Sequence, residues 1–183
     1  WAGDGPRLIP RSVLFGNPER MLPQVSPDGR LLAWIAPRNG ALNVWVHAVG
    51  DPPSSARVVT SDPKRGIRQF LWQEDSQHLI YLQDHDGDEN WHLYQVPVEE
   101  GGAPARDVTP GQLQARVIGR SPELPDQLVV ALNERDPRFH DAYRLDLKSG
   151  QRTLLAENPG DVEYYLADHQ LRVRAALARL PAE

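Results

Sequence analysis

The sequence contains no cysteine, which excludes disulfide bonds, thiolate metal sites and a cysteine nucleophile within its 183 residues. Basic residues are also in the minority, because 20 Lys and Arg stand against 25 Asp and Glu, for a formal net charge of −5. Binding to a phosphate backbone depends on clustered Lys and Arg, so we do not expect a nucleic-acid partner. The lack of cysteine is compatible with a cytoplasmic, periplasmic or secreted location and does not fix the compartment.

Long apolar runs and helical periodicity are scarce. No run of 18 apolar residues is present, so we expect no membrane-spanning helix and no membrane partner. Residues 9–20 favour one short turn of helix, with Leu14 and Phe15 as buried anchors. Residues 171–180 alternate like a strand in their first half and are rich in helix formers in their second, and the phase of the sequence repeat favours a strand.

Three aromatic residues at a fixed spacing form the strongest pattern in the sequence. Trp45, Tyr94 and Tyr143 follow one another at intervals of 49 residues, and each lies in a short alternation of apolar and polar residues. Such alternation is typical of a β-strand, and repetition at this period is typical of propeller blades. The sequence therefore predicts an all-β fold, namely an incomplete β-propeller of about three and a half four-stranded antiparallel blades.

The repeat divides the chain into an arm and successive blades. Residues 1–20 form the N-terminal lead-in arm, and the blades cover about residues 21–60, 67–109 and 115–157, with the start of a fourth at 162–179. Because propellers close with roughly 4 to 8 blades, we expect an open arc that is the N-terminal piece of a longer protein. Its free strand edges and uncovered blade face predict self-association with a second copy of the chain.

Residues 84–90, Asp-His-Asp-Gly-Asp-Glu-Asn, form the densest acidic cluster and are followed by Trp91 and His92, and three interpretations of the cluster stay open. The first is a solvated hairpin tip in which Gly87 takes a positive φ. The second is a calcium loop, although Glu89 stands where an EF-hand needs glycine. In the third, Asp88 and Glu89 bind a cationic group such as a peptide α-ammonium.

Other candidate binding residues are few. Arg65 and Arg68 precede an aromatic strand and either bind a carboxylate or form salt bridges between blades, the second interpretation being favoured. The six histidines show no zinc-site spacing, so we expect no metal site and no cofactor. The candidate substrate-binding residues are therefore Arg68, Asp88, Glu89 and Asn90.

Several strings, in order along nearly the whole chain, carry a resemblance to a known family. They are Ser26-Pro27-Asp28-Gly29, residues 65–72, residues 86–94, residues 132–137 and residues 156–160. Together they resemble the propeller of prolyl oligopeptidase family serine peptidases, in particular the dipeptidyl and acylaminoacyl peptidase branch. Ser-Pro-Asp-Gly alone is shared with many propellers, including the TolB type.

The resemblance implies a propeller that admits peptide substrates, excludes folded proteins and docks an α/β-hydrolase domain, which carries the catalytic residues of such peptidases. No catalytic residue is assigned in this chain, which has no Gly-x-Ser-x-Gly elbow. The alternative is a stand-alone TolB-like propeller that binds a peptide or protein partner and does no chemistry. A Gly-x-Ser-x-Gly motif further along the same reading frame would favour the peptidase.

Overall fold

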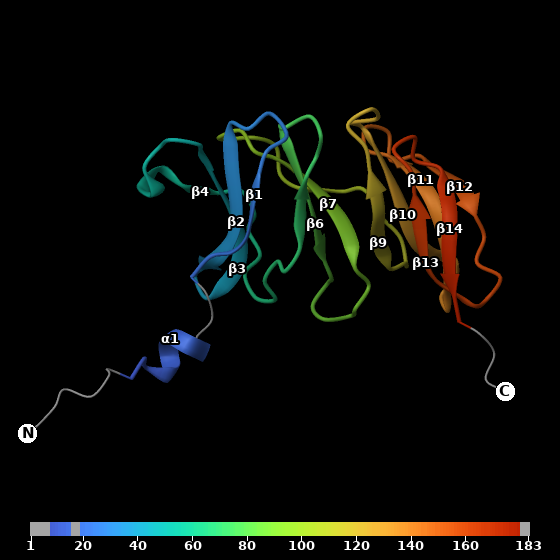
Figure 1. Cartoon of the computed structure of the whole chain (residues 1–183), viewed down its shortest axis with the longest axis horizontal. Helices are drawn as coiled ribbons and strands as arrows, with labels where there is room; N and C mark the ends of the chain where they lie inside the picture. Colours follow the sequence, from blue (N-terminus) through green and yellow to red (C-terminus); the bar gives the residue numbers. More distant parts are fainter. Residues whose placement is uncertain (1–7, 16–18, 180–183) are drawn as a thin grey trace, which may run out of the picture.

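The computed structural model describes residues 8–15 and 19–179. In these residues a short helix, α1 (Arg11–Phe15), precedes four separate antiparallel sheets, three of four strands and one of two. Figure 1 shows the sheets side by side in chain order, from the blue N-terminal sheet on the left to the red C-terminal one on the right. The described helices include none with the length and apolar character needed to cross a membrane.

Each sheet is a meander in which consecutive strands are neighbours. The first has β1 (Met21–Val25), β2 (Leu31–Arg38), β3 (Ala41–Ala48) and β4 (Arg57–Val58), with the 3-10 turn η1 (Pro53–Ser55) before β4. The second has β5 (Phe70–Trp72), β6 (His78–Gln83), β7 (His92–Pro97) and β8 (Arg106–Asp107). The third has β9 (Ala115–Arg120), β10 (Gln127–Asp136), β11 (Phe139–Asp146) and β12 (Arg152–Ala156), and the fourth has β13 (Val162–Ala167) and β14 (Val173–Ala178).

The aromatic repeat corresponds to one position in the strand register. Trp45 of β3 lies opposite Trp34 of β2, and Tyr94 of β7 lies opposite Tyr81 of β6. Tyr143 of β11 lies opposite Val130 of β10. The all-β class and the four-stranded antiparallel units predicted from the spacing are confirmed.

The hydrophobic core lies between successive sheets. Ile35 and Val44 of the first sheet pack in one cluster with Trp72 and Leu79 of the second, and these four side chains are at most 1% exposed. A second cluster joins the second and third sheets through residues that include Ile80, Leu93, Leu128 and Leu145. Full burial of one such aliphatic side chain contributes about 1.5–3 kcal/mol, so the stacking of the sheets stabilises the arc.

Contacts between the first strands of successive sheets identify the inner side of the arc. Gln24 of β1 donates a side-chain hydrogen bond to the Phe70 carbonyl of β5 (2.9 Å), and the Trp72 indole donates to the Gln24 carbonyl (3.1 Å). Arg120 of β9 donates to the Trp72 carbonyl at 2.8 Å. β9 in turn contacts β13. The first strands thus run next to one another, as they do around the central channel of a propeller.

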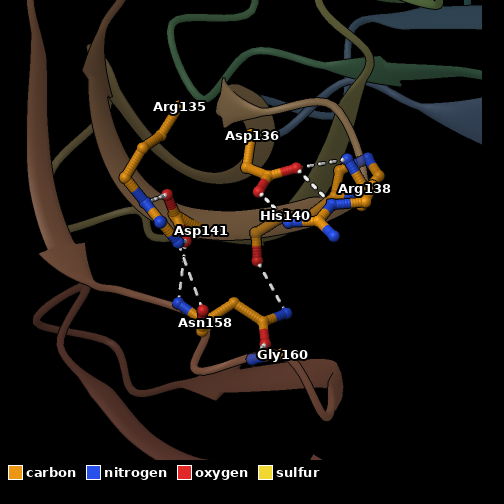
Figure 2. Close-up of polar contacts among 7 residues, drawn as sticks. All are labelled: Arg135, Asp136, Arg138, His140, Asp141, Asn158 and Gly160. Atoms are coloured by element: carbon orange, nitrogen blue, oxygen red, sulfur yellow. Dashed lines mark hydrogen bonds and ion pairs between the residues drawn. The ribbon is translucent and has the colours of Figure 1, made fainter.

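Buried polar side chains recur near the start of the third strand of a sheet and just after its fourth strand. Thr60 Oγ1 accepts a hydrogen bond from Val44 N, and Thr109 Oγ1 accepts one from Leu93 N, both at 2.9 Å. In the third sheet the acceptor lies on the third strand instead: Asp141 of β11 accepts from Asn158 N, which follows β12, at 2.7 Å (Figure 2). These bonds satisfy backbone donors that would otherwise be buried without an acceptor.

Two expectations for the ends of the chain had different outcomes. The short helix is present, but the expected burial of its anchors is wrong, because Leu14 is 57% exposed and Phe15 is 78% exposed. A helix of five residues is too short to present a continuous apolar stripe to a sheet. At the other end β14 pairs antiparallel with β13, which confirms the strand interpretation of that segment. Residues 1–7 of the lead-in arm lie outside the described residues.

Candidate functional site

The acidic cluster forms the loop between β6 and β7, the hairpin tip of the second sheet. Gly87 has a φ of 92°, as the hairpin interpretation expected, and Asp86 and Glu89 also have positive φ values of 52° and 60°. Residues other than glycine adopt a positive φ at a cost in conformational free energy, so contacts with neighbouring residues must stabilise the loop. The contacts of Asp84 and Asp88 do so.

Asp84 anchors the loop from inside the protein. Its side chain is only 1% exposed and forms a salt bridge with Arg65, whose Nη2 lies 3.0 Å from Oδ2. The Arg65 guanidinium also lies against Gly87, where an added Cβ would stand 3.2 Å from Nη1. Of the two arginines considered from the sequence, Arg65, which precedes β5, is therefore already paired with a carboxylate, that of Asp84 directly after β6.

Asp88 and Asn90 are occupied with the loop itself. Asp88 Oδ1 accepts from His85 N (3.1 Å) and Asn90 N (3.0 Å), and Oδ2 accepts from Asn90 Nδ2 (3.2 Å). Desolvation raises the pKa of Asp88, but these hydrogen bonds outweigh it and hold the pKa below its ordinary value. Asp88 is thus an exposed, ionised carboxylate at a defined position. The Glu89 side chain is exposed and has no salt bridge among the described residues.

Arg68 lies on a cavity of about 350 Å³ between the second and third sheets. Leu82 and Trp91 contribute apolar surface to its lining, and Gln114 and Arg116 contribute polar groups. Gln114 Nε2 donates to the Glu89 carbonyl at 2.9 Å, so the cavity wall is tied to the acidic loop. The structure thus brings Arg68 and the backbone of Glu89 to one region. The carboxylates of Asp88 and Glu89 lie outside the residues that line the cavity.

Arg116 and Gln114 were not among the residues singled out from the sequence. Ala115 N bonds to the Trp91 carbonyl (2.7 Å) and Ile67 N bonds to the Leu42 carbonyl (2.8 Å), so Ala115 and Ile67 are equivalent positions. Arg116 and Arg68 follow them directly and are therefore equivalent as well. Alignment of the blades on their first strands, in addition to the aromatic repeat, would have identified Arg116.

A related cavity of about 170 Å³ lies between the third and fourth sheets. His140 lines it, and both desolvation and the nearby Arg116 cation lower the pKa of His140 to about 4. Tyr165 also lines it, and burial raises the pKa of its hydroxyl. His140 Nε2 and Tyr165 OH are buried and have no hydrogen-bond partner among the described residues. Their neutral forms are therefore favoured at pH 7.

Comparison with known sequences gives two informative relatives. The chain is 46% identical to dipeptidyl aminopeptidase BIII of Pseudoxanthomonas mexicana over 178 residues, which is 97% of this chain and 25% of that protein. It is 25% identical to dipeptidyl peptidase family member 6 of Caenorhabditis elegans over 180 residues, 92% of this chain and 23% of that protein. The chain thus spans about a quarter of the length of these relatives. No protein-family model matches it.

Comparison with solved structures identifies the fold. The β-propeller domain of the Trilobed protease from Pyrococcus furiosus matches with a TM-score of 0.56 and 19% identity, over 81% of this chain and 46% of that one. TolB from Acinetobacter baumannii matches with a TM-score of 0.58 and 14% identity, over 87% of this chain and 38% of that one. The predicted incomplete propeller is confirmed, and the family resemblance agrees with the sequence relatives.

Proposed function

We propose that the chain is the propeller portion of a dipeptidyl peptidase family protein, that it admits peptides to an α/β-hydrolase catalytic domain and that it docks that domain. The observation that carries the proposal is the homology to dipeptidyl aminopeptidase BIII along nearly the whole chain. In this function the propeller does no chemistry of its own. It selects unfolded peptides by size and holds them by charge.

The acidic loop and its neighbouring cavity support the binding part of the proposal. The Glu89 carboxylate is exposed and unpaired among the described residues, and Asp88 places a second negative charge next to it. Opposite charges attract more strongly near the low-dielectric protein surface than in bulk water. We propose that Glu89, with Asp88 next to it, attracts the α-ammonium of a peptide, while Asn90 holds the loop and Arg68 interacts with the peptide nearby.

The test is equilibrium binding of dye-labelled tetrapeptides to the 183-residue chain, followed by fluorescence anisotropy. A peptide with a free amino terminus is expected to bind about tenfold more tightly than its N-acetylated form, the usual difference for one charge-assisted contact. Glu89→Gln removes that preference. Glu99→Gln is the matched control, because Glu99 is an exposed residue after β7 that does not line the cavity at Arg68. Equal binding of both peptides to the unmodified chain would refute the charge-based role.

A stand-alone binding module is the second candidate, because the arc also matches TolB in fold. The two candidates predict different coding sequences downstream of Glu183. A Gly-x-Ser-x-Gly motif downstream in the same reading frame supports the peptidase, since that elbow presents the serine nucleophile of α/β-hydrolases. A stop codon directly after Glu183 supports the module.

A further inference from the structure

The cavities between neighbouring sheets repeat with the blades, but their charges differ. Arg68, Leu82, Trp91 and Arg116 line the cavity between the second and third sheets. Arg116, Ala131, His140 and Glu163 line the one between the third and fourth. Each residue of the second set stands 47 to 49 positions after its counterpart in the first, so both cavities are built from equivalent positions.

The first cavity therefore has two arginines where the second has an arginine and a glutamate. The described residues that line the first cavity include no Asp or Glu. Glu163 in the second is in a salt bridge with Arg179, whose Nη2 lies 2.7 Å from Oε1. Positive charge is thus concentrated in the cavity between the second and third sheets, although the net charge of the chain is −5.

Both guanidinium groups of the first cavity are available to a ligand. Neither Arg68 nor Arg116 forms a salt bridge with any described residue, and the one side-chain partner of Arg116 there is Gln114 Oε1 at 3.2 Å. Three other arginines in or next to the second and third sheets are paired with carboxylates: Arg65 with Asp84 at 3.0 Å, Arg120 with Glu74 at 3.3 Å and Arg135 with Asp141 at 2.7 Å. Two adjacent unpaired arginines on one cavity are an anion-binding arrangement.

We propose that Arg68 and Arg116 together bind a carboxylate of a peptide in this cavity. Guanidinium groups match the planar geometry of a carboxylate, and Leu82 and Trp91 offer apolar surface to the residue that bears it. A volume of about 350 Å³ lies within the range of small-ligand pockets. The carboxylate comes either from the carboxyl terminus of the peptide or from an Asp or Glu side chain. The inference rests on the proposed peptide-binding function and extends it to the acidic groups of the peptide.

The experiment measures binding to the 183-residue chain by isothermal titration calorimetry at constant ionic strength. The probes are Ala-Ala-Ala, Ala-Ala-Ala-amide, Ala-Glu-Ala-amide, N-acetylglycine and inorganic phosphate. Ala-Ala-Ala-amide has no carboxylate and therefore loses both arginine contacts. We expect it to bind at least tenfold more weakly than Ala-Ala-Ala. The Ala-Glu-Ala-amide arm shows whether a side-chain carboxylate restores the affinity, and this distinguishes the two sources.

Arg68→Gln and Arg116→Gln are each expected to weaken Ala-Ala-Ala and N-acetylglycine about tenfold and to weaken Ala-Ala-Ala-amide much less. Arg30→Gln is the matched control, because the Arg30 side chain is 85% exposed on the first sheet. Because Arg68 and Arg116 are also exposed, we expect their substitution to leave the melting temperature unchanged. Measuring the melting temperature of each variant checks that it is folded.

The outcomes separate this inference from the proposed function. If N-acetylglycine binds through both arginines but peptides show no preference for a free amino terminus, the amino-terminal role of Glu89 is wrong and the carboxylate site stands. If amidated and free peptides bind equally, or if the arginine variants bind N-acetylglycine as the unmodified chain does, the carboxylate site is refuted. Binding of phosphate in preference to N-acetylglycine also refutes it.

Discussion

Gly66 shows at the scale of a single residue how the blades constrain the connections between them. Its φ is 77°, and an added Cβ would stand 2.9 Å from the backbone nitrogen of Leu42 in the preceding sheet. Gly29 has the same φ of 77° but nothing within 4 Å of the added Cβ. At both positions a residue with a Cβ would be strained by the positive φ. Only at Gly66 would the Cβ also approach a neighbouring residue too closely.

We expect Gly29→Ala to lower the free energy of unfolding by about 1 kcal/mol, because alanine is strained at positive φ. Gly66→Ala should lower it by about 3 kcal/mol, since the first and second sheets must also separate slightly to make room. Urea denaturation followed by tryptophan fluorescence measures both values. Equal losses for the two variants would show that the close approach to Leu42 costs nothing.

The buried carboxylate of Asp141 makes part of the stability depend on pH. Its side chain is fully buried and accepts two hydrogen bonds from Arg135, at 2.7 and 2.8 Å, and one from Asn158 N (Figure 2). The Arg135 hydrogen bonds, opposed by desolvation, hold the pKa of Asp141 below its ordinary value. A lowered pKa in the folded state stabilises the protein fully above the unfolded pKa of about 3.9, and this contribution is lost as the pH falls through the folded pKa.

Asp141→Asn is therefore expected to lower the free energy of unfolding at pH 7 by about 2 kcal/mol, because Arg135 loses its charged acceptor. Thermal melts between pH 2 and 7 should show the difference from the unmodified chain shrinking below about pH 4 as Asp141 is protonated. Asp136→Asn is the control, because that carboxylate pairs with an arginine that is 73% exposed, and its effect should be smaller. A difference that stays constant over the whole pH range would contradict the assignment.

At the scale of elements, β13 and β14 form a sheet with one covered face and one open face. Tyr164 and Leu166 on β13 lie opposite Leu177 and Ala175 on β14, so these side chains share a face. Tyr164, Leu166 and Leu177 are 64%, 64% and 58% exposed. Tyr165 points to the other side and is only 7% exposed. β14 also has one free edge in the described part of the chain.

We expect the backbone amides of β14 to exchange with deuterium far faster than those of β10, which lies between two neighbours in a four-stranded sheet. Hydrogen exchange followed by mass spectrometry gives the protection of both strands in one sample. The amides of β2 and β6, which are also central strands, serve as internal references. Equal protection of β10 and β14 would mean that the two-stranded sheet is as stable as the complete ones.

The same elements show what could be predicted from the sequence. The interval between Trp45, Tyr94 and Tyr143 predicted the meander sheets, because one aromatic occupies the same register in each. The burial of Leu14 and Phe15 was predicted wrongly, since composition does not show whether a partner surface exists. The cavity that joins Arg68 to Arg116 could not be seen from local pattern alone, because it forms only when two sheets stack.

At the scale of the whole molecule, the four described sheets form an open arc whose first and last sheets each have a neighbouring sheet on one side only. The fourth sheet presents its apolar face at one end, and Val25 of the first sheet, at the other end, is 56% exposed. Exposed apolar faces and free strand edges favour association with another chain. A second copy of this chain is one partner that offers complementary ends.

We therefore expect sedimentation velocity to show reversible self-association of the 183-residue chain at tens of micromolar. Leu166→Lys and Leu177→Lys should each shift the equilibrium toward the monomer, because a charge would be buried without a partner. Leu154→Lys tests specificity, because Leu154 is also exposed, at 44%, but lies on β12 of a complete sheet. A clean monomer at these concentrations would rule out self-association through the open faces.

The central claim is that peptides bind at the cavity between the second and third sheets, next to the first strands of these sheets. Amide chemical-shift mapping of the isotope-labelled chain with Ala-Ala-Ala, below the concentration of self-association, tests it most directly. We expect the shifts to concentrate at residues 66–71, 86–91 and 114–117, where Arg68, Glu89 and Arg116 lie. Shifts confined to β4, β8 and β12, or no shifts at millimolar peptide, would contradict it.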